Sequence, residues 1–202
     1  MQKPDSVRRI VRMKVENSLR QLQTDYLDAL LMHWPYPDFF QEIWHEMEAV
    51  YNEGLVRSIG VCNCRQRHFE KLRQTCAILP MINQFETSPI NSKPELAEYC
   101  RQNDIQVMIY SPLMNLRLQS RPQYHDLLQH LAGKYSKTKA QIVLRFDVQR
   151  GMIPIPKSTH RERLESNIGI FDFTLSEEEM RQLLACNENR QYMPESRSCP
   201  GL

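Results

Sequence analysis

The sequence predicts an α/β fold in which about five short parallel strands form a β/α barrel or a piece of one. Short apolar runs alternate along the chain with segments of helical periodicity, which is typical of a parallel sheet with right-handed crossovers. No GxGxxG phosphate loop follows the first apolar run, which argues against a Rossmann domain. No linker-like stretch divides the sequence, so we expect a single domain over residues 1–202.

Five apolar runs have the length and the bounding turn residues expected of strands. They lie at residues 27–34, 56–62, 80–85, 105–110 and 152–157. The last run, MIPIPKS, contains two prolines, which cannot donate a ladder hydrogen bond. We therefore expect this strand to be short or irregular.

Helical periodicity and capping residues define the segments between the strands. Gly54 is a typical residue after a helix end, Pro94 suits a first turn, and Thr138 is a favourable N-cap. Ser176 with Glu179 forms a capping box that opens the last helix. The expected helices are 6–24, 39–54, the segment containing Phe69 and Leu72, 92–103, 123–136, 138–151 and the one that begins after Ser176. A polar, loop-like tail is expected over residues 187–202.

Composition argues against several classes of protein. Lys+Arg 26 against Asp+Glu 24 gives a net charge of +2, so no global field attracts nucleic acid. No stretch approaches the roughly 18 apolar residues of a membrane span, and the N-terminus lacks the apolar core of a signal peptide. Six cysteines without a framework spacing indicate reduced thiols and a cytoplasmic protein. Cys62 and Cys64 with nearby His68 lack a second ligand pair, so no metal site is predicted.

Polar residues close every apolar run, as active-site residues do at the carboxyl ends of barrel strands. These strand-end residues are His33, Cys62 with Asn63, Gln84 with Glu86, Tyr110 with Ser111, and Lys157 with Ser158. Each has a simpler interpretation: a core histidine, amides that bond loop backbone, a core tyrosine, or a solvated helix start. Together they offer carboxamides, a ring, a cation and an imidazole, which suits a flat amide-bearing cofactor with phosphates and a polarised substrate oxygen.

The same residues lie in motifs that resemble the aldo-keto reductase family over essentially the whole chain. The motifs are DYLDALLMHWP, GLVRSIGVCN, NQFE, YSPL, IPKSTHRERLESN and FDFTLSEEEM. The resemblance implies an eight-stranded (β/α)8 barrel of the TIM type. It also implies NADP(H) as cofactor, reduction of an aldehyde or ketone to an alcohol by hydride transfer, and a small-molecule carbonyl substrate.

The resemblance assigns a role to each strand-end residue. His33 is similar to the family's active-site histidine, which hydrogen-bonds the substrate carbonyl. Asn63 and Gln84 resemble the side chains that hold the nicotinamide carboxamide, and Tyr110 resembles the ring that stacks on the nicotinamide.

Further residues resemble the family's contacts to the phosphates and the adenosine. Ser111 and Leu113 would line the pyrophosphate path, and Lys157, Ser158 and Arg163 would clamp the 2′-phosphate that distinguishes NADP(H) from NAD(H). The residue implied to meet the adenine is Asn167.

The resemblance further implies an N-terminally incomplete barrel that lacks the first three β/α units. The family's catalytic tyrosine, aspartate and lysine belong to those units, so His33 alone of the four catalytic residues is expected here. Such an arc has two open sheet edges, which self-association or an N-terminal fragment would complete. The alternative function is a catalytically inactive, dinucleotide-binding or regulatory pseudoenzyme.

Overall fold

The computed structural model describes residues 5–117 and 121–192, so the predicted tail lies outside the described residues from position 193 onward. Contacts between Cα atoms divide the chain into two compact units. Unit 1 comprises the described residues up to Gln84 together with Glu98–Gln106, and unit 2 comprises Phe85–Ala97 and the described residues from Val107 onward. None of the helices in the described part of the chain is long and apolar enough to cross a membrane.

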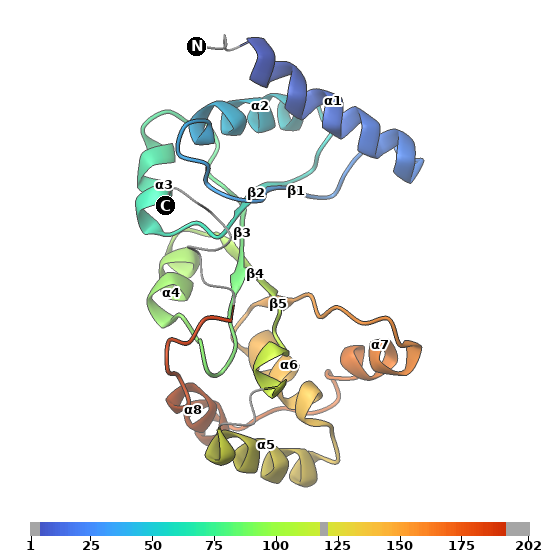
Figure 1. Cartoon of the computed structure of the whole chain (residues 1–202), viewed down its shortest axis with the longest axis vertical. Helices are drawn as coiled ribbons and strands as arrows, with labels where there is room; N and C mark the ends of the chain where they lie inside the picture. The colour runs from blue at the N-terminus through green and yellow to red at the C-terminus, as the bar shows by residue number, and fades with distance from the viewer. Residues whose placement is uncertain (1–4, 118–120, 193–202) are drawn as a thin grey trace. The chain divides into compact units, whose positions relative to one another are not determined.

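Strands and helices alternate in the order that the sequence predicts (Figure 1). The elements are α1 (Asp5–Leu22), β1 (Leu30–Met32), α2 (Phe40–Asn52), β2 (Ile59–Cys62), α3 (Gln66–Arg73), β3 (Ile82–Glu86), α4 (Pro94–Gln102), β4 (Gln106–Tyr110), the 3-10 helix η1 (Met114–Arg117), α5 (Pro122–Tyr135), α6 (Lys139–Gln149), β5 (Ile153–Pro154), α7 (Arg161–Ile168) and α8 (Glu177–Ala185).

The five predicted strands are confirmed, and their order in the sheet follows the chain, β1-β2-β3-β4-β5. In unit 1, Gly60 of β2 pairs in parallel with Leu31 of β1 and with Ile82 of β3. In unit 2, Met108 of β4 pairs in parallel with Ile153 of β5. Every observed strand is shorter than its apolar run, β3 and β4 by only one residue. The shortest strand is β5, as its prolines predict.

The predicted helix ends are also confirmed. Gly54 has the left-handed φ of 78° that follows a helix end, and its N–H bonds the Tyr51 carbonyl at 2.9 Å. Thr138 caps α6 and Ser176 caps α8, each through a capping box. The sequence analysis anticipated helix α7 only as a solvated helix start, one of the simpler interpretations of the strand-end residues, and none of the residues of α7 is buried.

Unit 2 is built around one apolar core. Its buried residues come from α5, α6 and α8, from the segment that precedes α8 and from the segment between β3 and α4. They are Ile90, Tyr124, Leu128, Leu131, Ala132, Ile142, Val143, Phe146, Leu175 and Leu183. Two hydrogen bonds connect the segment that follows α8 with the segment between β3 and α4. The Glu188 N–H donates to the Ile90 carbonyl at 2.9 Å, and the Tyr192 N–H donates to a Glu86 carboxylate oxygen at 2.6 Å.

Asp147 on α6 gives unit 2 a pH-dependent stability. It is fully buried, and neither carboxylate oxygen has a hydrogen-bond partner among the described residues. Burial raises the pKa of Asp147 well above its ordinary value, and the positive charge of Arg150 offsets only part of that rise. The folded state therefore holds a proton that the unfolded chain releases above about pH 4, so this carboxyl reduces stability as the pH rises.

We expect Asp147→Asn to raise the free energy of unfolding at neutral pH by on the order of 1–3 kcal/mol, because it removes the cost of ionising a buried carboxyl. The gain should shrink as the pH falls below about 4, where the carboxyl becomes protonated in the unfolded chain as well as in the folded state. Urea unfolding at neutral pH and at about pH 3 measures the difference. Asp126→Asn is the control, because the Asp126 side chain is exposed. An equal effect of Asp147→Asn at both pH values would contradict this assignment.

Candidate active site

Three predicted site residues of unit 1 meet where β1, β2 and β3 lie side by side. The register aligns Met32 with Val61, so His33 and Cys62–Asn63 follow adjacent strands at the same level. The Asn63 N–H donates to the Gln84 carbonyl at 2.8 Å, and the Asn63 side-chain amide donates to the His33 carbonyl at 3.3 Å. The structure therefore brings His33, Asn63 and Gln84 into one cluster, with Gln84 inside β3 rather than after its end.

The His33 side chain is exposed, so the interpretation as a buried core histidine is wrong. Its ring lies 5.5 Å, centroid to centroid, from the ring of buried Trp34. Its imidazole makes no hydrogen bond to any described residue, although its carbonyl accepts one from Asn63. An imidazole that is oriented by a neighbouring ring and has uncommitted nitrogens can act as a hydrogen-bond donor to a ligand.

Asn63 is held in an unusual backbone conformation. Its φ of 59° lies in the left-handed region, which asparagine tolerates better than other non-glycine residues. The side chain is 6% exposed, and its bond to the His33 carbonyl agrees with the simpler interpretation of an amide that bonds loop backbone. Left-handed residues cluster at ligand sites, where the surrounding structure holds them in place.

Asn83 of β3 supports this cluster through the segment that follows β2. The sequence analysis did not predict this role of Asn83. It is fully buried in β3, and its side-chain amide donates to the Cys64 carbonyl at 3.0 Å while its oxygen accepts the Cys64 N–H at 3.4 Å. This pair of bonds fixes the segment that carries Asn63. The signal in the sequence was a second amide beside Gln84 in NQFE, but periodicity cannot show that a strand amide faces a neighbouring loop.

The thiols and the histidine near Asn63 have structural roles. Burial raises the pKa of Cys62 to about 11, so its thiol is protonated at neutral pH. His68 accepts the Arg65 N–H at 2.9 Å and so caps α3. Burial, with the nearby positive charges of Arg67, Arg65 and Lys71, lowers the pKa of His68 to about 4. In the described part of the chain no three His, Cys, Asp or Glu side chains are grouped to hold a metal ion.

The other predicted site residues belong to unit 2. Tyr110 is the last residue of β4 and is half-buried, so it is not a core tyrosine. Ser111, directly after it, has a left-handed φ of 53°, so Asn63 and Ser111 share this conformation immediately after β2 and β4. Leu113 packs against the core of unit 2 and anchors the following turn.

A group of polar residues surrounds the N-terminus of α7. The Ser158 hydroxyl accepts the His160 N–H at 3.1 Å, which fixes the turn that leads into the helix. Lys157 precedes this turn, Arg163 lies in the first helical turn, and both side chains are exposed. Within the described residues neither makes an ion pair, whereas Arg161 of the same turn is paired with Glu165 at 2.8 Å. Two unpaired cations beside a helix N-terminus are suited to an anionic group.

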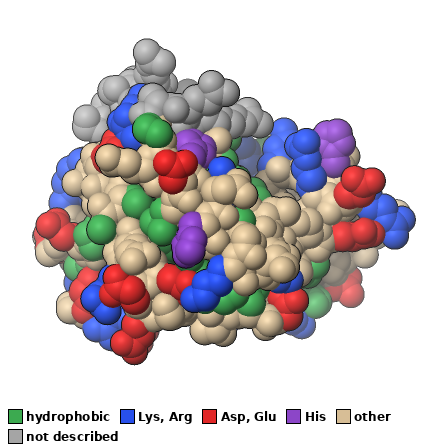
Figure 2. All heavy atoms as spheres, turned by 90° about the horizontal axis from the view of Figure 1, so that it is seen from below, with side chains coloured by type: hydrophobic (Ala, Val, Ile, Leu, Met, Phe, Trp, Pro, Cys, Tyr) green, Lys and Arg blue, Asp and Glu red, His purple; other side chains and the backbone are tan. Residues whose placement is uncertain are grey.

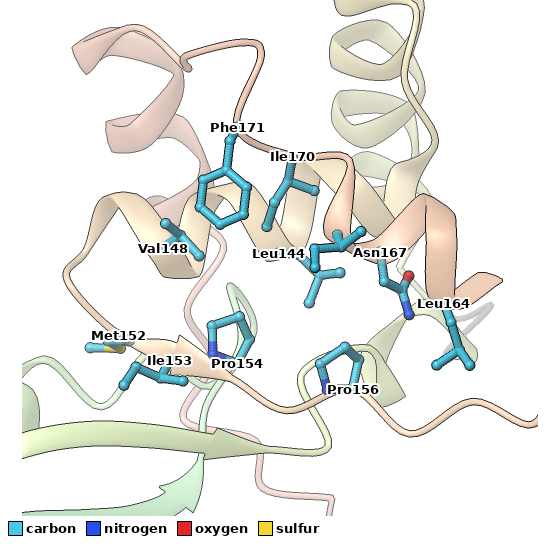
Figure 3. A pocket seen from close by; sticks show the side chains of 11 residues that line it. Leu144, Val148, Met152, Ile153, Pro154, Pro156, Leu164, Asn167, Ile170 and Phe171 are labelled. Carbon is cyan, nitrogen blue, oxygen red and sulfur yellow. The ribbon is translucent and has the colours of Figure 1, made fainter. Parts of the chain in front are cut away.

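Asn167 lies at the end of α7, against a pocket of about 470 Å³ (Figure 3). The pocket lies between α6, β5, α7 and the segment that follows α7, and Asn167 is the only polar residue among the eleven that line it. Asn167 lies on the same helix as Arg163, which is compatible with the predicted contact to the adenine. The sequence analysis did not predict the apolar lining of this pocket.

Charges are otherwise mixed on the surface. Figure 2 shows Lys and Arg side chains interspersed with Asp and Glu on the face seen from below. The net charge of +2 thus results from near balance rather than from large opposing patches on that face.

These features define a parallel α/β protein with amides and an imidazole at the strand ends of one unit and a cationic, hydroxyl-bearing helix start in the other. The sequence model described as "Aldo/keto reductase family" matches residues 1–188. The chain belongs to the aldo-keto reductase family.

Individual relatives agree with this membership. An uncharacterized oxidoreductase of Bacillus subtilis is 42% identical over 180 residues, covering 89% of this chain and 63% of that protein. A glyoxal reductase of the same organism is 40% identical over 179 residues, with 89% and 63% covered. The solved structure of a Bombyx mori aldo-keto reductase in complex with NADP matches with a TM-score of 0.84 and 37% identity, covering 94% of this chain and 67% of that one. The chain thus spans about two thirds of the length of these relatives.

Proposed function

We propose that this chain is part of an NADP(H)-dependent oxidoreductase that reduces a small aldehyde or ketone to an alcohol. The observation that carries the proposal is the group at the start of α7, where Lys157 and Arg163 are exposed and unpaired among the described residues beside the turn held by Ser158. This donor set fits a phosphate monoester, and the Bombyx mori relative was solved with NADP.

The residues of unit 1 fit the reacting end of the same reaction. Asn63 and Gln84 supply carboxamide groups, each of which can donate to and accept from a nicotinamide carboxamide. The exposed imidazole of His33 donates to the substrate carbonyl oxygen, where negative charge develops as hydride arrives. Bound NADPH supplies that hydride.

The predicted site residues of unit 2 fit further contacts to the cofactor. Tyr110 offers a half-buried ring on which a nicotinamide can stack. Ser111 and Leu113 would line the pyrophosphate path, and Asn167 would meet the adenine.

We propose a small carbonyl compound as the substrate class, supported by the glyoxal reductase of Bacillus subtilis among the relatives. Cytoplasmic location is proposed with it, supported by the free thiols of all five described cysteines, Cys62, Cys64, Cys76, Cys100 and Cys186.

Turnover is proposed to require the part of the barrel that relatives have and this chain does not match. The missing part would come from a second copy or from an N-terminal fragment. The limited coverage of the relatives also favours a second candidate function, a catalytically inactive chain that binds dinucleotide without turnover.

NADPH oxidation in the presence of glyoxal distinguishes these functions. We expect oxidation that depends on both the carbonyl and the protein, measured with the chain alone and with the missing part added. His33→Phe should lower kcat by about 10²–10³-fold with little change in NADPH affinity, because it removes a donor to the developing oxyanion while keeping a ring at this position. NADPH binding without turnover under both conditions would favour the inactive protein, and turnover that is unchanged in His33→Phe would refute the role of His33.

A further inference from the structure

Three polar side chains of unit 2 end in buried atoms that no described residue hydrogen-bonds. These atoms are the hydroxyl oxygen of Tyr124 on α5, both carboxyl oxygens of Asp147 on α6, and Nη1 of Arg150, which directly follows α6. Tyr124 is 4% exposed and Asp147 is fully buried. Because nearly all buried polar groups in proteins have a hydrogen-bond partner, these four atoms require a partner from outside the chain.

The three side chains lie in one electrostatic environment, although no hydrogen bond joins their polar atoms. Asp147 and Arg150 are three residues apart, which places them on the same face at the end of α6. Burial and then the charge of Asp147 raise the pKa of Tyr124, and the same charge opposes the decrease that burial causes in the pKa of Arg150. Asp147 is therefore near both other groups without bonding either.

The mixture of donors and acceptors selects the kind of ligand that fits. The protonated carboxyl of Asp147 offers a donor and an acceptor, the Tyr124 hydroxyl can donate or accept, and Nη1 of Arg150 donates. A metal cation would be repelled by the guanidinium, and an anion would be repelled by the acceptor oxygen of the carboxyl. Water offers two donors and two acceptors, and buried waters typically make about three hydrogen bonds to otherwise unpaired groups.

We propose that Tyr124, Asp147 and Arg150 form an internal water site that binds at least one solvent molecule between α5 and the end of α6. The site affects the segment between β3 and α4, because the other arm of the Arg150 guanidinium donates to the Ser92 carbonyl at 2.6 Å. The Ser92 N–H in turn donates to the Asn187 side chain at 2.9 Å. Bound water thus orients the guanidinium that fastens this segment to α6.

Oxygen-17 relaxation dispersion of the solvent tests the site, because it counts water molecules that stay bound for longer than the protein takes to tumble. We expect Asp147→Leu to lower the count by at least one, since leucine removes both carboxyl oxygens. Asp147→Asn should keep the count, because an amide retains a donor and an acceptor. Tyr135→Phe is the control for loss of a hydroxyl on α5, since the Tyr135 hydroxyl donates to Glu179 at 2.6 Å.

Tyr124→Phe tests the same site through stability and keeps the shape of the buried ring. We expect it to lower the equilibrium constant for folding by about 3- to 10-fold, as the loss of one hydrogen bond does. A hydroxyl without any partner would instead make the substitution neutral or stabilising, because burying it costs free energy. In Asp147→Leu the effect of Tyr124→Phe should fall below about twofold. Urea unfolding measures these effects, and circular dichroism checks that all variants fold.

Three outcomes would overturn the proposal. They are an unchanged water count in Asp147→Leu, a Tyr124→Phe protein at least as stable as the parent, and a crystal structure in which Asp147 bonds Arg150 or Tyr124 directly with no water between them. These measurements use no dinucleotide, so their failure is distinguishable from failure of the proposed cofactor binding.

Discussion

Alanine substitution of Lys157 or of Arg163 is expected to weaken NADPH binding by about 10- to 100-fold and to leave NADH binding within about threefold. Each cation lies exposed and unpaired among the described residues at the start of α7, where it can form a charge-assisted hydrogen bond to the 2′-phosphate. Such bonds contribute about 1.5–3 kcal/mol each, and NADH has no group at that position. Isothermal titration of both dinucleotides measures the two effects.

Arg161→Ala provides the matched control for both variants. Arg161 lies in the same helical turn as Arg163, but its guanidinium is paired with Glu165 at 2.8 Å. Arg161→Ala therefore removes one positive charge from the first turn of α7, as Arg163→Ala does, but it leaves the unpaired cations Lys157 and Arg163 in place. Equal losses in Arg161→Ala and Arg163→Ala would mean that only overall charge matters, and equal losses for NADPH and NADH would refute a 2′-phosphate site.

Gly60→Ala is expected to destabilise unit 1 by about 3 kcal/mol or more. Gly60 lies in β2 between the neighbouring strands, and a Cβ at this position would lie 2.6 Å from Leu31 Cδ2, 2.7 Å from the Ile82 carbonyl oxygen and 2.8 Å from Ile82 Cβ. The Ile82 carbonyl cannot move without disrupting the parallel pairing of Gly60 with Ile82. Relaxation of the structure around an added Cβ is therefore costly in free energy. Because Asn63 follows three residues later, the variant should also lose the arrangement of His33, Asn63 and Gln84.

Gly133→Ala is the control for this substitution. Gly133 lies in α5, and a Cβ there would meet no atom within 4 Å. Alanine is favoured over glycine in a helix, so this variant should be more stable by up to about 1 kcal/mol. Urea unfolding of both variants measures the contrast, and a Gly60→Ala protein as stable as the parent would show that the packing around β2 is looser than these distances imply.

The element order and most helix ends were predictable because they depend on local chemistry. Gly54, Thr138 and Ser176 act through their own backbone freedom or side-chain hydrogen bonds, so a few neighbouring residues determine the outcome. Strand lengths were overestimated because pairing ends where the neighbouring strand ends, which an apolar run does not record. Helix α7 was anticipated only as a solvated helix start, because a helix that buries none of its residues gives a weak periodic signal.

The site was predictable at the level of residue type and strand-end position. The sequence placed His33, Asn63 and Gln84 at strand ends, and the register of β1, β2 and β3 brings them together. The left-handed conformation of Asn63 and the supporting bonds of Asn83 depend on contacts between distant segments, so no local pattern predicts them.

Titration of the full chain with NADPH, followed by the fluorescence of the reduced nicotinamide, tests the central claim most directly. The account predicts a saturable change with a stoichiometry of one and an affinity for NADPH at least tenfold higher than for NADH, because the proposed site uses Lys157 and Arg163 to bind the 2′-phosphate. The absence of saturable binding, or equal affinity for the two dinucleotides, would contradict it.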